Sequence, residues 1–414
     1  MSLVNRLQTC LTLLLLIALA TCAEAENWPG WRGPQRTGIT TDTGVPSTWS
    51  ATENVMWKTP LPGTGISNPV VWQDRVFITA AEGREQSELH VLCLDRDSGE
   101  VRWHKRLWGT APTVFYYPKS GLASPTPITD GKRLWTFFGT GDVFCFDLDG
   151  GLLWQRALAD EYGPFENRFA AASSPLLYND SVILQCDHYG ASYVLAMDGT
   201  TGANRWKSER PEAWLSWSSP QLTPVGERFE LVLSGSEKLD GYDPATGERR
   251  WSVRGLVREC VPTPVLGAGL VFVVSGPNGA HLAVKPGGKG DVTDTHVVWR
   301  NDRGTSFVPS AIVVGDRYYL SDDKGIASCL SIADGDLLWR KRFSGKFTAS
   351  PVAADGKLFF TSESGSTFVI DATAAEYREL ARNEIGEDVY SSPAISQGRM
   401  FIRTAKQLIC IGTK

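Results

Sequence analysis

The 414-residue sequence has no run of lysine or arginine, and its 46 acidic residues outnumber its 41 basic residues, which gives a net charge of −5. A nucleic-acid partner requires a basic surface that neutralises phosphates, so this composition argues against one. The five histidines show no spacing typical of metal ligands, and we predict no metal site from them. The adjacent pair Asp187-His188 is interpreted as a polar turn, with a metal site as the alternative.

Nucleotide-binding and hydrolase signatures are missing as well. The glycine-rich run Pro286–Gly290 lacks the G-x-x-x-x-G-K-[ST] pattern that cradles phosphates. No G-x-S-x-G segment is present to hold a nucleophilic serine. We therefore assign no catalytic residue from sequence motifs.

Cysteine offers no disulfide framework. Of the 8 cysteines, Cys10 and Cys22 lie before residue 26. Four of the others share one position of the repeat described below: Cys93, Cys145, Cys329 and Cys410. Equivalent positions of different repeats lie far apart, so we expect buried free thiols.

Residues 1–25 have the pattern of a secretion signal. Arg6 precedes the apolar run Leu11–Ala20, which is interrupted only by Thr12, and Ala23-Glu24-Ala25 is a cleavage signal of the A-x-A type. The run is too short to cross a bilayer as a permanent helix. We predict a cleaved signal and export to the periplasm or a cell surface, with a lipid anchor at Cys22 as the alternative, and no transmembrane span in the mature chain.

A strand–turn–strand unit recurs along the rest of the chain. Ala196–Trp206 reads A-M-D-G-T-T-G-A-N-R-W, with Asp and Gly in the turn and Trp on the following strand. Related segments are Cys93–Trp103, Cys145–Trp154, Gly241–Trp251 and Cys329–Trp339. A repeat at such a period fixes the fold before any other feature does.

Each unit opens with a small polar residue next to proline. The openings are Asn68-Pro69, Ser124-Pro125, Ser174-Pro175, Ser219-Pro220, Thr263-Pro264, Pro309-Ser310, Ser350-Pro351 and Ser392-Pro393, spaced 41 to 56 residues apart. Four short antiparallel strands fit in each unit, which predicts an all-β, eight-bladed β-propeller over residues 54–414. The last unit lacks its fourth strand, and residues 54–61 supply it and close the ring. The tryptophan-rich segment 26–53 is expected to pack against the body, with binding of a partner as the alternative.

The unit A-x-D-x-x-T-G-x-x-x-W resembles the tryptophan-docking repeat of the quinoprotein-like (PQQ-like) eight-bladed propellers. We expect the repeat tryptophans to wedge between neighbouring blades: Trp57, Trp103, Trp154, Trp206, Trp251, Trp299 and Trp339. The fifth unit departs from the pattern by the insertion Lys285–Asp294. In the seventh, Glu379 stands near the Trp position, so we expect a weaker contact there.

Binding residues are expected on one face, where the loops from each fourth strand to the next first strand meet the turns between second and third strands. The candidates form a rim of both charge signs with aromatic side chains: Tyr116, Tyr117, Arg168, Trp214, Trp217, Arg258, Glu259, Arg303, Lys346, Glu387, Asp388 and Tyr390. A rim of solvated charges without a ligand is the alternative.

The resemblance implies two functions. One branch of the family contains pyrroloquinoline-quinone (PQQ) dehydrogenases, and another contains the non-catalytic propeller of the outer-membrane β-barrel assembly machinery. The first would need cationic partners for PQQ, oxygen ligands for Ca²⁺ and a carboxylate base, for which Arg168, Arg258, Trp217, Glu259 and Asp388 have suitable side chains. The blades are compact and no two cysteines are adjacent, unlike those dehydrogenases. We therefore favour a monomeric, cofactor-free envelope scaffold with a protein or peptide partner, and keep the PQQ-dependent dehydrogenase as the alternative.

Overall fold

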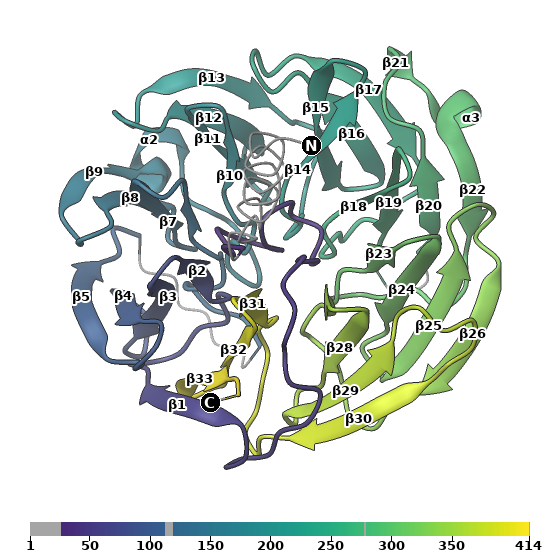
Figure 1. Cartoon of the computed structure of the whole chain (residues 1–414). Helices are drawn as coiled ribbons and strands as arrows, with labels where there is room; N and C mark the ends of the chain where they lie inside the picture. The colour runs from purple at the N-terminus through teal and green to yellow at the C-terminus, as the bar shows by residue number, and fades with distance from the viewer. Residues whose placement is uncertain (1–25, 112–118, 277–278, 414) are drawn as a thin grey trace, which may run out of the picture.

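Eight sheets surround a central axis in the computed structural model, which describes residues 26–111, 119–276 and 279–413 (Figure 1). Their strands pair antiparallel except for the last strand of the five-stranded sheet, Gly290–Asp291, which pairs parallel. Seven sheets have four strands and one has five, so the predicted all-β, eight-bladed propeller is confirmed. The described helices are the short α2 (Leu158–Tyr162) and α3 (Thr293–His296). Within the described ranges, neither the length nor the apolar content of any helix suffices to cross a membrane.

The blades follow one another along the chain, and we number them from one to eight. Blades one and two contain β2 (Val70–Trp72), β3 (Arg75–Glu82), β4 (Glu88–Asp95) and β5 (Val101–Trp108), then β6 (Ile128–Thr129), β7 (Arg133–Phe137), β8 (Asp142–Asp147) and β9 (Leu152–Ala157). Blades three and four contain β10 (Leu176–Tyr178), β11 (Ser181–Cys186), β12 (Tyr193–Asp198) and β13 (Asn204–Glu209), then β14 (Gln221–Val225), β15 (Arg228–Gly235), β16 (Lys238–Tyr242), β17 (Arg249–Arg254) and β21 (Gly290–Asp291). Blades five and six contain β18 (Val265–Gly267), β19 (Leu270–Val274), β20 (His281–Val284) and β22 (Val297–Asn301), then β23 (Ile312–Val314), β24 (Arg317–Ser321), β25 (Ile326–Ser331) and β26 (Leu337–Arg342). Blades seven and eight contain β27 (Val352–Ala354), β28 (Lys357–Thr361), β29 (Ser366–Asp371) and β30 (Glu379–Glu384), then β31 (Ala394–Ser396), β32 (Arg399–Arg403), β33 (Gln407–Ile411) and β1 (Val55–Pro60).

The two ends of the propeller meet in blade eight. Strand β1 pairs antiparallel with β33, with Trp57 opposite Cys410 and Pro60 opposite Gln407. The predicted ring closure is therefore confirmed, and it leaves no open sheet edge between the first and last blades.

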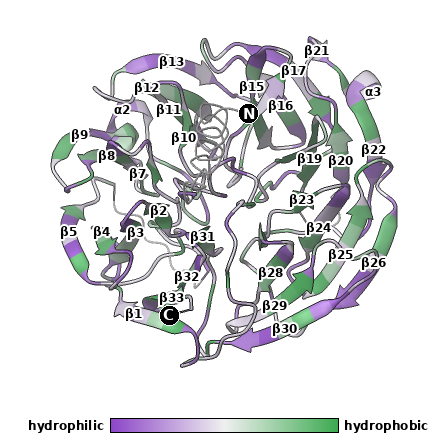
Figure 2. Ribbon diagram, viewed as in Figure 1, coloured by the Kyte–Doolittle hydropathy of each residue, from purple (hydrophilic) through white to green (hydrophobic). Residues whose placement is uncertain are grey.

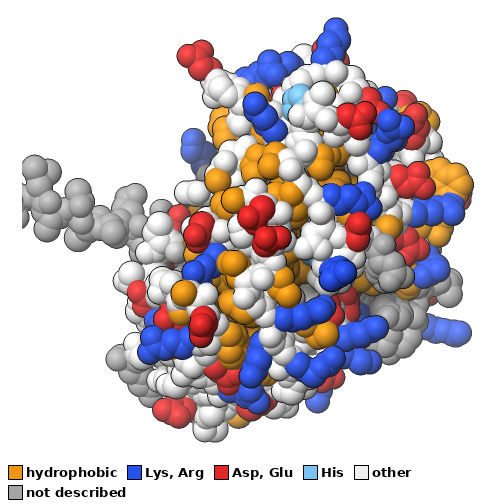
Figure 3. Space-filling view, turned by 90° about the vertical axis from the view of Figure 1, so that its right-hand side faces the viewer, with side chains coloured by type: hydrophobic (Ala, Val, Ile, Leu, Met, Phe, Trp, Pro, Cys, Tyr) orange, Lys and Arg blue, Asp and Glu red, His pale blue; other side chains and the backbone are white. Residues whose placement is uncertain are grey.

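Burial explains the strand pattern. The second and third strands of each blade are apolar and buried, as in β4, whereas fourth strands such as β5 alternate between exposed and half-buried side chains. Figure 2 shows this change from hydrophobic inner strands to mixed outer strands. On the outer surface in Figure 3, acidic and basic side chains are interspersed with apolar ones.

A closed circle of hydrogen bonds surrounds the axis, with one residue from each blade. The backbone N–H of each opening residue donates to the side-chain oxygen of the opening residue in the next blade, at 2.7 to 3.3 Å. The members are Asn68, Thr126, Ser174, Ser219, Thr263, Ser310, Ser350 and Ser392. The predicted opening of blade two at Ser124 is wrong: Thr126 joins the circle, and Ser124 instead bonds to Gly121 in the preceding loop.

The repeat tryptophans lie in the apolar clusters of the propeller. Trp154 illustrates the common arrangement, because its Nε1 donates to Gly199 O at 3.1 Å in the turn of the next blade. Its ring lies against Gly202, where a Cβ would come within 2.8 Å and where φ is +74°. This Gly therefore permits the turn and accepts the preceding blade's indole. The same pairing recurs as Trp57–Gly99, Trp103–Gly150, Trp206–Gly247 and Trp299–Gly335.

Three blades depart from this arrangement. In blade six, Trp339 lies beside Tyr377 of blade seven, with ring centroids 5.3 Å apart. In blade four, Trp251 donates instead to Glu230 Oε2 within its own sheet at 2.6 Å, and β21 of the insertion lies beside β17. In blade seven, the position that pairs like the repeat tryptophans holds Ala381, which lies opposite Val369. The assignment of Glu379 to this position is wrong, because the bulge that shifts the register places Glu379 opposite Ile370.

Residues 26–53, which we call the N-terminal segment, pack against the propeller on the face of the turns between first and second strands (Figure 1). Trp28 pairs with Val71 of β2 and is 1% exposed. The buried Arg32 donates to Pro351 O and Ala311 O at 3.0 and 2.6 Å. Burial lowers the pKa of Arg32 to about 9. This value is still above neutral pH, so the guanidinium stays charged.

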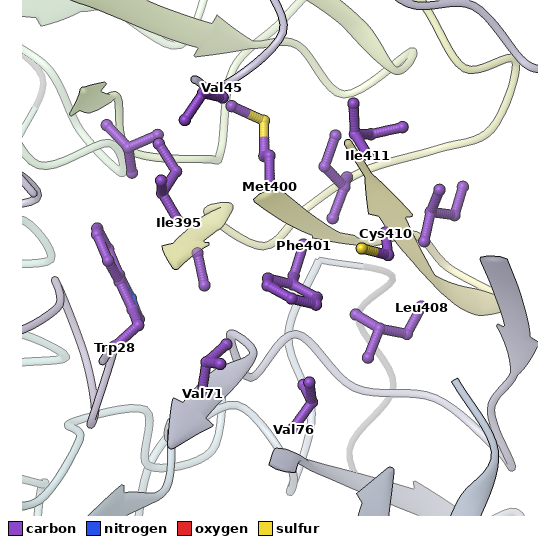
Figure 4. Close-up of a cluster of buried hydrophobic side chains, with 14 of the residues drawn as sticks. Trp28, Val45, Val71, Val76, Ile395, Met400, Phe401, Leu408, Cys410 and Ile411 are labelled. Atoms are coloured by element: carbon purple, nitrogen blue, oxygen red, sulfur yellow. The ribbon is translucent and has the colours of Figure 1, made fainter. Parts of the chain in front are cut away.

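The segment also completes the interface between blades seven and eight. Trp49 is 4% exposed, and its ring centroid lies 6.2 Å from that of Phe359 in blade seven. It belongs to a cluster that includes residues of blade eight. Figure 4 shows part of this cluster, with Val45 beside Met400 and Trp28 near Ile395. Ala381 packs against the same cluster, so Trp49 supplies an indole where the repeat lacks one.

All cysteines of the described residues are buried and free, as predicted. Burial raises the pKa of Cys93 to about 12, so its thiol stays protonated at neutral pH and acts as a small apolar side chain.

Candidate functional site

A cavity of about 490 Å³ opens on the face opposite the N-terminal segment, at the mouth of the central channel. We call it the funnel. It is built by loops between blades and by the turns between second and third strands of blades six and seven. Its lining residues are Ile66, Lys119, Ser120, Phe169, Ala172, Trp217, Val261, Phe307, Val308, Asp323, Lys324, Lys346, Thr348 and Glu363.

Two hydrogen bonds fix Trp217 in the wall of the funnel. Its backbone N–H donates to Cys260 O at 2.8 Å, and its Nε1 donates to Ala170 O at 2.9 Å. The ring centroids of Phe169 and Trp217 are 5.6 Å apart, and the guanidinium carbon of Arg168 lies 4.5 Å from the centroid of the Phe169 ring. Aromatic surface is therefore presented to the funnel by side chains with fixed positions.

Charged side chains of both signs stand among these aromatic groups. Glu363 Oε1 accepts from Lys119 and from Thr348 Oγ1, both at 2.7 Å. The two oxygens of Asp323 accept from the backbone N–H groups of Phe307 and Val308 at 2.8 and 3.2 Å. Burial raises the pKa of Asp323, against the effect of these hydrogen bonds.

Lys324 and Lys346 stand at the rim of the funnel, where both side chains are exposed. Within the described part of the chain, neither has an ion-pair partner. The two free ammonium groups give the funnel an attraction for anions.

The channel below the funnel is narrow, with a volume of about 90 Å³. The circle of opening residues lines it, and Tyr390 and Trp217 stand at its upper end. At its other end, Trp31 of the N-terminal segment donates its Nε1 to Thr263 Oγ1 at 2.9 Å. The N-terminal segment therefore blocks the channel, and the funnel is a blind cavity.

The structure brings only part of the predicted rim together. Trp217 and Lys346 line the funnel, Tyr390 lines the channel, and Arg168 covers Phe169. The predicted Tyr116 and Tyr117 lie outside the described residues.

Other predicted rim residues do not line the cavity. The guanidinium carbon of Arg258 lies 3.8 Å from the ring centroid of the exposed Trp214. Glu387 accepts a hydrogen bond from Thr404 Oγ1 at 2.7 Å. Glu259, Arg303 and Asp388 are not among the lining residues. Asp187 is buried and bonds to Arg210 at 2.9 Å, so it supports blade three from within.

The sequence interpretation missed Lys119, Phe307, Asp323, Lys324 and Glu363. Asp323 and Lys324 lie in the turn after the second strand β24, and Glu363 lies in the turn after the second strand β28. Since such turns share the face of the inter-blade loops, their charged residues could have been added to the candidates.

Comparisons with known proteins agree on the fold. The solved BamB of Moraxella catarrhalis is 13% identical with a TM-score of 0.62, covering 87% of this chain and 97% of its own. A europium-containing methanol dehydrogenase is 10% identical with a TM-score of 0.70, covering 92% and 90%. The quinohemoprotein alcohol dehydrogenase of Comamonas testosteroni is 13% identical with a TM-score of 0.68, covering 95% and 82%. At such identities the likeness shows the fold alone.

No curated protein sequence matches the chain. A family model described as outer membrane protein assembly factor BamB matches residues 35–211, 88–334, 288–376 and 323–412, which overlap and reach across most of the chain. The chain therefore belongs to this family of PQQ-like propellers.

Proposed function

We propose that this protein is a non-enzymatic scaffold of the cell envelope, and that its funnel binds a segment of a partner protein. The funnel itself carries the proposal: a cavity of about 490 Å³ with aromatic walls and a lysine rim. Binding pockets usually have volumes of this order, with apolar walls and a few polar groups that orient the ligand.

The side chains favour a particular kind of segment. Phe169, Trp217 and Phe307 offer apolar surface for one large side chain of the partner. Lys324 and Lys346 stand where they would meet acidic residues beside that anchor. We therefore expect a segment with an apolar anchor and acidic flanks.

The envelope location is supported by two observations. The first 25 residues have the pattern of a secretion signal. The matching family model is described as the outer membrane protein assembly factor BamB.

The alternative, a PQQ-dependent dehydrogenase, fits the funnel poorly. Ca²⁺ takes six to eight oxygen ligands, but the carboxylates that line the cavity are already engaged. Asp323 accepts two backbone N–H groups, and Glu363 Oε1 accepts from Lys119 and Thr348. The sequence analysis named five residues for a PQQ site, and of these Trp217 lines the cavity whereas Arg168, Arg258, Glu259 and Asp388 do not.

Peptide binding tests the proposal directly. The probes are two fluorescein-labelled peptides with one central phenylalanine, one flanked by acidic residues and one by lysines, measured by fluorescence anisotropy. We expect the acidic peptide to bind more tightly and the double variant Lys324→Glu/Lys346→Glu to weaken it about tenfold, because two exposed attractions become repulsions. Lys132→Glu, on the opposite face, is the matched control and should bind as the wild type does. Equal affinities of the double variant and the wild type would contradict the proposal.

A second titration separates the two functions. The purified protein is mixed with PQQ and Ca²⁺, and binding is followed by the quenching of tryptophan fluorescence. We expect no saturable binding and no alcohol oxidation. Tight binding with dye reduction by an alcohol would overturn the scaffold function.

A further inference from the structure

Three potential metal ligands converge at the β3–β4 hairpin of blade one. Glu82 ends β3, Glu88 begins β4 directly opposite it, and His90 lies two residues further on the same face. One ligand atom from each of the three lies within 4.8 Å of the other two. This hairpin is outside the funnel and has no part in the proposed peptide binding.

His90 supplies independent evidence that the cluster is directed at a ligand. Its side chain is 1% exposed, and its Nε2 makes no hydrogen bond with the described residues. The Glu82 carboxylate stands beside this nitrogen, with Oε2 3.3 Å away, but not in hydrogen-bond geometry. Ala80 stands opposite His90 in the sheet, and its small side chain leaves room there. A buried ring nitrogen without a hydrogen bond is costly unless something binds it.

We propose that Glu82, Glu88 and His90 form a binding site for a divalent transition-metal ion of the Zn²⁺ class. Ligand atoms about 2.0–2.1 Å from a tetrahedral zinc lie about 3.3 Å from one another. The separation of His90 Nε2 and Glu82 Oε2 already has this value. Glu82 is 51% exposed, so its carboxylate can adjust to the ion with little repacking.

The second nitrogen of His90 has the partner that a metal ligand needs. His90 Nδ1 lies 3.0 Å from Nε2 of His104 on β5. If Nε2 of His90 binds the ion, Nδ1–H donates to His104, which fixes the tautomer and the ring orientation. His104 is therefore a positioning residue.

Arg106 does not block the site. It contacts Glu88 through Oε1 in both of its bonds, and its own side chain is 66% exposed. Glu88 Oε2 takes part in neither of these bonds, and the arginine can move into solvent. An imidazole with two carboxylates suits Zn²⁺, Co²⁺ or Mn²⁺, whereas Ca²⁺ and Mg²⁺ prefer oxygen ligands alone.

Zinc binding to the untagged mature chain tests the site. Isothermal titration with Zn²⁺ should give one site per chain, and Co²⁺ should give the intense visible absorption of a four-coordinate site. Glu82→Gln should weaken Zn²⁺ binding at least about tenfold, because it removes an exposed ligand without disturbing the core. Glu85→Gln makes the same charge change on the same hairpin outside the cluster, and it should bind as the wild type does.

Two further variants distinguish ligation from general electrostatics. His90→Gln should abolish the Co²⁺ absorption, and His104→Gln should weaken Zn²⁺ binding about 10–100-fold while keeping one site. Circular dichroism checks that each variant is folded. No saturable Zn²⁺ binding by the wild type, or equal binding by wild type and Glu82→Gln, would overturn the proposal.

Discussion

Truncation of Trp49 tests whether the N-terminal segment is a structural part of the propeller. Trp49 is 4% exposed in the cluster between blades seven and eight. A buried tryptophan covers about 150–250 Å², and at about 25 cal/mol per Å² this area corresponds to about 4–6 kcal/mol as an upper value. Large-to-small substitutions of buried aromatic residues cost about 3–5 kcal/mol. We therefore expect Trp49→Ala to lower the free energy of unfolding by about 3–5 kcal/mol in urea titrations followed by circular dichroism.

A second substitution tests whether Trp49 replaces the missing repeat tryptophan. Ala381→Trp restores the repeat pattern in blade seven. In the wild type it should cost about 1–3 kcal/mol, because Trp49 already fills the cluster. In the Trp49→Ala background it should recover part of the loss, giving a coupling energy of about 0.5–3 kcal/mol. Additive effects, or a cost of Trp49→Ala below about 1 kcal/mol, would refute this reasoning.

Three other perturbations test the remaining fold elements. Ser350→Ala removes the acceptor of the Ser310 N–H in the axial circle, so it should cost about 1–3 kcal/mol in urea titrations, and Ser350→Thr should recover most of it; a neutral Ser350→Ala would contradict the role of the circle. Gly202→Ala should lower the melting temperature in differential scanning calorimetry, since φ is +74° and its Cβ would meet Trp154, while Gly386→Ala, at the same φ with no neighbour within 4 Å, serves as the control and should lower it less. Burial lowers the pKa of His281 from 6.5 to about 4. The stability that its neutral form contributes is therefore complete above about pH 6.5 and is lost as pH falls through 4, a loss of about 3 kcal/mol. If His281→Gln left the pH dependence of the free energy of unfolding unchanged, this account would be contradicted.

Much of the fold was predictable because the same strand and turn pattern recurs in the sequence of most blades. The Asp-Gly turns and the tryptophan that follows them recur in most blades, and the missing fourth strand of the last unit predicted the pairing of β1 with β33. The opening of blade two was misplaced because two polar–proline pairs stand in succession, Ser124-Pro125 and Thr126-Pro127. Only the hydrogen bonds around the axis show that Thr126 is the equivalent residue.

The sites were less predictable because they depend on contacts between distant segments. Glu363 meets Lys119 across the funnel, 244 residues away in the sequence. Glu82 and His90 meet because a hairpin places them on one face, and their spacing matches no metal-binding motif. Trp49 fills an interface that the sequence of blade seven leaves short of an indole. Such contacts follow from the register and from the ring closure, which a single sequence does not state.

Site-specific photocrosslinking in intact cells tests the binding face most directly. A photoreactive phenylalanine derivative is placed at Lys346 on the funnel rim and, as the matched control, at Lys132 on the opposite face. The scaffold function predicts a discrete crosslinked partner from position 346 and none from position 132, with loss of the adduct when Lys324 is changed to glutamate. A partner captured only from position 132, or equally from both positions, would contradict the assignment of the funnel as the binding site.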